Sequence, residues 1–120
     1  MQQFRLSHDG WAKTQDSTAN TINTLTVPAV AGLRHGIVNL TVCTSGAVTA
    51  TALNIVIKDG ATAVWKTTIP AASVVGSVFG DVFNYPLICV SNNSALSIVV
   101  DAGGAGCITT INAQGFTTIE

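Results

Sequence analysis

The residues whose types and spacing favour chemistry lie in a glycine-rich loop near the end of the chain. Residues 95–106 are ALSIVVDAGGAG, an apolar strand-like run followed by Gly103, Gly104 and Gly106. Such a loop binds phosphate when it opens a helix, because backbone N–H groups then converge on the anion, often beside a lysine. Here the glycines lead into CITTI, whose β-branched residues favour a strand, and no lysine or arginine follows Lys66. The loop is therefore predicted to be a turn with positive φ angles at glycine, and not a nucleotide site.

Histidine and cysteine are the next candidates for acid–base, nucleophilic or metal-binding chemistry. His35 shares strand parity with Cys43, but eight residues of strand span about 26 Å, so the two cannot form a nucleophile pair. His35 is predicted to be a strand-edge or interface residue. Cys43, Cys89 and Cys107 lie in strand-like runs with no C-x-x-C spacing, which favours buried free thiols over a disulfide and predicts no metal or redox site.

The carboxylates give no recognisable acid–base pair. Asp59 and Asp101 stand beside turn residues, and the remaining acidic residues are scattered along the chain with no calcium-loop spacing. The sequence therefore predicts a protein that is not an enzyme and that holds no metal or cofactor.

The amino-acid composition limits the classes of partner that the protein is expected to bind. Only 9% of the 120 residues are charged and 48% are hydrophobic, whereas about 25% charged residues is usual. Two explanations stay open: strands with threonine-rich outer faces, or a surface covered by partners in an assembly. The net charge of −1 attracts no nucleic acid, and no apolar run reaches the roughly 20 residues that span a bilayer. With no apolar signal region at its start, the chain is expected to be soluble and made in a cytoplasm.

The elements that position these residues are predicted to be short strands. From Leu25 onward, apolar and polar residues alternate in seven or eight runs separated by turn signals, such as Asp59-Gly60. No segment favours a helix, so the pattern predicts an antiparallel sandwich or barrel. The inward sets are expected to be Leu25 and Val27; Val38, Leu40 and Val42; Leu53, Ile55 and Ile57; Trp65 and Ile69; Phe83, Tyr85, Leu87 and Cys89; and Leu96, Ile98 and Val100.

The first 22 residues differ from the rest. They show neither helical periodicity nor alternation, yet they carry apolar side chains that need cover. We therefore expect residues 1–22 to be an extended N-terminal arm and residues 23–120 to be the β-sandwich domain. The candidate contact residues of this arm are Phe4, Arg5, Leu6, Trp11 and Lys13.

A series of short motifs carries a family resemblance. VPAVAGLRH, IVIKDGATAVWK, YPL and NSALSIVVDAGGAGCITTINAQGF resemble, in order and spacing, a pattern in small structural proteins of tailed bacteriophages and prophages. The resemblance covers roughly residues 25–116. Gly36 replaces an aromatic residue of that pattern, Asn93-Ser94 replaces a glycine, and residues before 25 have no counterpart.

The resemblance implies a function as well as a fold. The family members understood best resemble cement or decoration proteins, which are jelly-roll or β-sandwich domains on the outside of an icosahedral head. It thus implies a jelly-roll sandwich that bridges major capsid proteins on the capsid exterior. The protein would self-associate as a dimer or trimer on a symmetry axis, and the particle would be assembled in the host cytoplasm. The five arm residues would contact the capsid or another subunit. The alternative is a carbohydrate- or receptor-binding module of a head or tail fibre, which would use exposed aromatics in the end loops. Fold alone does not choose between the two.

Overall fold

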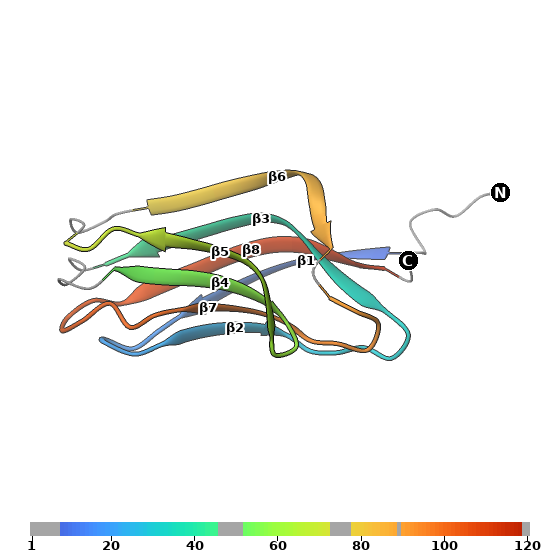
Figure 1. The fold of residues 1–120 in the computed structure, drawn as a ribbon, viewed down its shortest axis with the longest axis horizontal. Coiled ribbons are helices and arrows are strands. Elements are labelled where there is room, and N and C mark those ends of the chain that lie inside the picture. The colour runs from blue at the N-terminus through green and yellow to red at the C-terminus, as the bar shows by residue number, and fades with distance from the viewer. Residues whose placement is uncertain (1–7, 46–51, 73–77, 89, 119–120) are drawn as a thin grey trace.

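The computed structural model describes residues 8–45, 52–72, 78–88 and 90–118. In those ranges the chain forms two four-stranded antiparallel sheets packed on each other and no helix (Figure 1). The strand order is β1–β8–β3–β6 in the first sheet and β2–β7–β4–β5 in the second. The predicted antiparallel β-sandwich is confirmed. The strands are β1 (His8–Asp16), β2 (Asn23–Val27), β3 (Arg34–Thr44), β4 (Leu53–Asp59), β5 (Thr62–Ile69), β6 (Val78–Ile88), β7 (Leu96–Val100) and β8 (Thr109–Thr118).

The strand pairs are nested. β1 pairs with β8, β2 with β7, β3 with β6, and β4 with β5, all antiparallel. The chain is therefore one long hairpin whose tip is the predicted turn after Asp59, where Gly60 has a φ of +59°. Two further pairs, β3 with β8 and β4 with β7, complete the sheets.

The core lies between the sheets and follows the predicted alternation in most strands. In β4, Leu53, Ile55 and Ile57 are at most 1% exposed, because alternate residues of a strand point to opposite faces. The inward sets of β2 and β7 are likewise buried, as predicted. Tyr85, Leu87 and Cys89 lie outside the residues whose side chains the structure describes. The other buried hydrophobic residues are Ile37, Leu40, Val42, Ile69, Val90, Cys107, Ile111 and Ala113.

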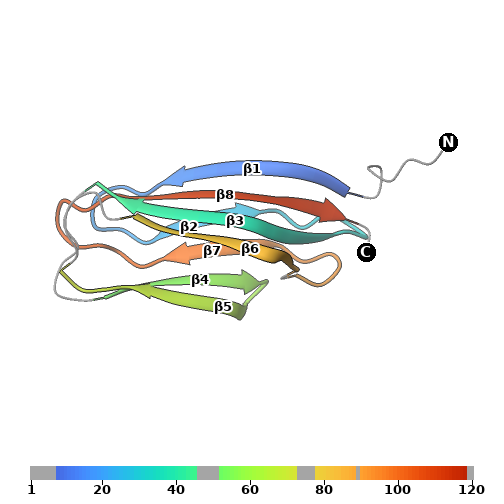
Figure 2. The same cartoon turned by 90° about the horizontal axis from the view of Figure 1, so that it is seen from above.

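The segment predicted to be an arm contains a strand. β1 pairs with β8 in continuous register from His8 opposite Thr118 to Asp16 opposite Thr110, and Figure 2 shows the two strands side by side. The prediction of an arm through residue 22 is therefore wrong for residues 8–16. Residues 12–16 are exposed on both faces of the strand, so their sequence shows no alternation of apolar and polar residues. Backbone hydrogen bonds to β8 hold this part of the strand in the sheet.

β3 departs from simple alternation at a bulge. Its register against both β6 and β8 shifts between Ile37 and Asn39. Ile37 is fully buried whereas Val38, predicted to point inward, is half-buried. Leu40 and Val42 are buried as predicted, but the extra residue reverses the facing of the residues before it, so Ile37 also points inward. A period of two cannot anticipate this change.

A buried amide ties the two sheets together on the β1–β2 side. Asn23 of β2 is 2% exposed, and its Nδ2 donates to the backbone oxygens of Gln15 (2.9 Å) and Thr109 (3.0 Å) in the other sheet. Both donors of the buried amide are thus satisfied, which burial of a polar group requires.

On the opposite side, aromatic rings close the sandwich. Trp65 of β5 is half-buried and packs against the core. Its ring lies 6.1 Å from Phe79 and 5.5 Å, edge-on, from Phe83, both of β6. Trp65 therefore joins the sheets at their β5 and β6 edges, close to its predicted core position.

Candidate functional site

The residues predicted to make contacts are only partly described. Phe4, Arg5 and Leu6 lie outside the described residues. Trp11 belongs to β1, where it packs against the core, and Lys13 is exposed on the same strand. The indole Nε1 of Trp11 is buried without a hydrogen-bond partner. Trp11 is therefore in part a packing residue of the sheet.

The glycine loop is a turn, as predicted. It carries the chain from β7 in the second sheet to β8 in the first, with φ angles of +102° at Gly104 and +76° at Gly106. The backbone N–H of Cys107 donates to the Gly104 carbonyl (3.0 Å). At the start of the loop, Asp101 accepts a bond from the backbone N–H of Asn54 (2.9 Å). The Gly104 carbonyl and the Asp101 carboxylate are therefore hydrogen-bonded within the fold.

His35 is a buried structural residue and not the predicted edge or interface histidine. It is 1% exposed; Nε2 lies 2.8 Å from the Pro28 carbonyl and Nδ1 lies 2.8 Å from the Thr117 hydroxyl. A carbonyl oxygen only accepts, so Nε2 donates, and in the neutral ring Nδ1 accepts from Thr117. His35 thereby fastens the segment before β3 to β8.

Two of the three cysteines lie in the described ranges. Cys43 is a half-buried free thiol, and Cys107 is buried. Within the described ranges, no group of three or more His, Cys, Asp or Glu side chains is placed to hold a metal ion. No helix of those ranges is long and apolar enough to cross a membrane.

Asp59 anchors the loop before β7 to the tip of the hairpin. Its Oδ1 accepts a hydrogen bond from the Ser94 hydroxyl (2.7 Å), and its Oδ2 accepts bonds from the Ser91 backbone N–H and hydroxyl (both 3.1 Å). The bond from Ser94 is the main cause that lowers the pKa of Asp59 below its ordinary value. Desolvation raises this pKa in part, and the two bonds from Ser91 lower it further.

This depressed pKa predicts an acid-sensitive loop anchor. The folded pKa lies below the unfolded one, so ionised Asp59 stabilises the fold above the ordinary pKa of about 4 and loses this effect as pH falls through the folded value. We expect Asp59→Asn to lower the melting temperature at pH 7 and to lose less stability than wild type between pH 5 and pH 2. Ser94→Ala, which removes the strongest bond, should act in the same direction. Parallel acid titrations of melting temperature check this; identical slopes for all three proteins would contradict it.

The outer surface of the first sheet is the strongest candidate for a binding site. Between Asp16 at one end and Arg34 at the other, the described outward positions of β1, β8, β3 and β6 carry no charged side chain. Rows across the sheet place hydroxyl and amide side chains side by side. We call this surface the polar face; its central residues are Thr14, Asn39, Thr41, Asn112 and Gln114.

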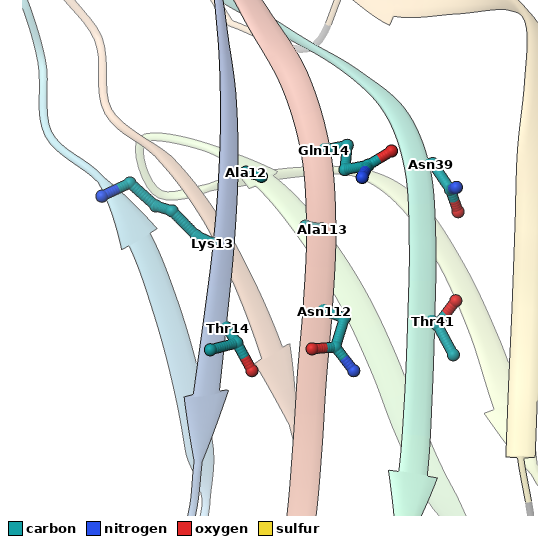
Figure 3. A pocket seen from close by; sticks show the side chains of 8 residues that line it. All are labelled: Ala12, Lys13, Thr14, Asn39, Thr41, Asn112, Ala113 and Gln114. Carbon is teal, nitrogen blue, oxygen red and sulfur yellow. The ribbon is translucent and has the colours of Figure 1, made fainter.

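The polar face is hollowed. A shallow hollow of about 350 Å³ is lined by these five residues together with Ala12, Lys13 and Ala113. Figure 3 shows the amides of Asn112 and Gln114 extending over the space between β8 and β3, while the Lys13 side chain extends away from them. The hollow is therefore lined by neutral donors and acceptors.

A free strand edge borders the polar face. β6 is the last strand of the first sheet, and its outward Val78 and Val82 are 68% and 65% exposed. Exposed apolar residues leave this part of the edge open to pairing with another chain, whereas Asp81 and Pro86 of the same strand are residue types that oppose pairing.

The polar face was not predicted from the sequence. Its residues come from three strands far apart in the chain, and they align only once the β1–β8 and β3–β8 registers are known. The available signal was the composition: few charges and abundant Thr, Asn and Gln at the outward positions of alternating strands.

The fold and the polar face define a small all-β sandwich protein in which the outer face of one sheet is largely uncharged. No protein-family model and no curated protein matches the sequence. Among solved structures, the crystal structure of PirA aligns with a TM-score of 0.47 and 9% identity, covering 89% of this chain and 93% of that chain. The cryo-EM structure of the giant freshwater prawn Macrobrachium rosenbergii extra small virus (XSV) VLP aligns with a TM-score of 0.39 and 12% identity, covering 92% of this chain and 79% of that chain. Neither alignment bears on function.

Proposed function

We propose that the chain is a virion structural protein, a cement protein that decorates the exterior of a tailed-bacteriophage capsid and bridges major capsid proteins. The motif resemblance over residues 25–116 motivates the proposal, and the low charge of 9% suits a surface that is covered in an assembly. The proposed mechanism is contact between surfaces, with no catalytic step.

The nested strand pairing supports the jelly-roll type. Wrapping one long hairpin into two sheets gives the orders β1–β8–β3–β6 and β2–β7–β4–β5. Eight strands in two sheets is the architecture that jelly rolls share. We infer on this basis that the sandwich is a jelly roll.

The observation that carries the proposal is the free edge of β6. Val78, Gly80 and Val82 point outward from this strand, and both valines are mostly exposed. Two copies of β6 that pair antiparallel about Gly80 would place Val78 of each opposite Val82 of the other, which is the self-complementarity that a twofold interface needs. The same edge also suits addition of a capsid strand.

The test is reconstitution of particles that lack the protein. The purified chain is added to such heads, and bound copies are counted by quantitative mass spectrometry. We expect a copy number comparable with that of the major capsid protein, because many weak contacts add through multivalency. Val82→Lys should leave the fold intact and remove most attachment, since a lysine on an edge opposes strand pairing.

Ile22→Lys is the matched control. Ile22 is 64% exposed and directly precedes β2, the edge strand on the side of the sandwich opposite β6, so the variant carries the same new charge away from β6. A handful of copies per particle for the wild type would refute the cement function, and full attachment of Val82→Lys would refute the role of the β6 edge in it.

A further inference from the structure

Two hollows join into one groove across the polar face. The hollow at Thr14, Thr41 and Asn112 shares Ala12 and Gln114 with a second hollow of about 480 Å³. Both hollows are shallow and open to solvent. The second hollow is lined by Gly10, Trp11, Ala12, Val38, Gln114 and Gly115. The groove therefore has a hydrophilic section and an apolar section in line.

The hydrophilic section offers unused hydrogen-bonding groups of both kinds. The amides of Asn39, Asn112 and Gln114 each carry two donors and an acceptor, and they make no side-chain hydrogen bond within the described part of the chain. They stand on neighbouring strands, with Gln114 opposite Asn39 and Asn112 opposite Thr41. A ligand whose own groups both donate and accept fits this arrangement best, and a hydroxyl is such a group.

The groove carries too few charged side chains to favour an ionic ligand. Lys13 is the one charged side chain among the lining residues of either hollow, and it extends away from the amides (Figure 3). An anionic or cationic ligand would gain no Coulomb attraction there and would still lose hydration. The occupant is therefore expected to be neutral.

We propose that this groove binds a neutral oligosaccharide. Ring hydroxyls would bond to the amides of Asn39, Asn112 and Gln114, and the C–H surface of a neighbouring ring would lie on the apolar section at Ala12 and Val38. The site lies on a sheet face and uses amides, which distinguishes it from a module that relies on aromatics in the end loops. The groove adjoins the β6 edge, because Asn39 and Thr41 lie opposite Val82 and Gly80. Oligosaccharide binding is nevertheless measured without particles, so its failure is distinguishable from failure of the proposed capsid function.

The experiment titrates the full chain with maltohexaose, cellohexaose and chitohexaose, and with anionic polygalacturonate, followed by NMR of the side-chain amides. At least one neutral oligosaccharide is expected to shift the resonances of Asn112 and Gln114, with affinity independent of salt. The double variant Asn112→Ala/Gln114→Ala should lower that affinity at least tenfold.

Gln15→Ala is the matched control, because it removes an exposed amide of β1 that lines neither hollow. Its affinity and the melting temperatures of all variants should match the wild type. The proposal is overturned if no neutral oligosaccharide shifts these resonances, or if polygalacturonate binds as well and its binding weakens with salt. Loss of particle attachment by the double variant without any oligosaccharide binding would assign the face to protein contact instead.

Discussion

Removal of residues 1–17 is expected to abolish stable folding of the β-sandwich. The deletion takes away the whole of β1, so β8 loses one of its two partner strands along nine residues and keeps only β3. The deletion also removes Trp11, which packs against the core. Buried Asn23 loses the Gln15 carbonyl as a hydrogen-bond acceptor, and the backbone N–H of Thr109 loses the Ser17 hydroxyl as its acceptor. Unpaired buried groups cost about 1–3 kcal/mol each, and total stability is only about 5–15 kcal/mol.

Thermal unfolding followed by circular dichroism checks this expectation. The protein without residues 1–17 should show no cooperative transition, and its exposed β8 edge should promote aggregation. Removal of residues 1–7 alone takes away none of these contacts and should leave the transition in place. A truncated chain that still unfolds cooperatively near the wild-type temperature would show that β1 is dispensable, as the sequence pattern had suggested.

The parts of the fold that the sequence could predict are those where one strand carries its own signal. Alternation in β2, β4 and β7 identified their buried residues because one face of each strand lies in the core. Asp59-Gly60 marked its hairpin because glycine adopts the left-handed region at no steric cost. Asn93 has a φ of +65°, a conformation that asparagine tolerates, and it lies in a stretch of polar turn residues before β7.

The parts that escaped prediction depend on neighbours in space. β1 has exposed residues on both faces and is held by backbone bonds, which no side-chain pattern records. The bulge at Val38 is fixed by two partner strands at once. The same holds for the candidate site: Asn39 and Gln114 are 75 positions apart and meet only through the β3–β8 register.

A close glycine contact shows this dependence on neighbours most directly. Gly115 of β8 lies between Trp11 of β1 and Ile37 of β3. A Cβ added there would overlap the backbone oxygen of Gly36 and come within 2.5 Å of Trp11 Cζ2. The sequence shows only a glycine in a strand, which is consistent with a bulge, a bend or a close approach.

Gly115→Ala is therefore expected to destabilise the protein by about 3 kcal/mol. The carbonyl of Gly36 belongs to an interior strand that is bonded on both sides, so it cannot swing away, and Trp11 is held against the core. Relief requires β1, β8 and β3 to separate locally, at the cost of ladder hydrogen bonds. Urea unfolding of the variant gives the change in free energy directly.

Gly10→Ala provides the control for this substitution. Gly10 lies on β1 one position from Trp11, and an added Cβ would meet only the Gly115 oxygen, at an ordinary 3.8 Å. Its stability should change by no more than about 0.5 kcal/mol. A Gly115→Ala variant as stable as Gly10→Ala would mean that the strands do not approach as closely as described. Since Gly115 also lines the second hollow, that result would remove the packing on which the groove is built.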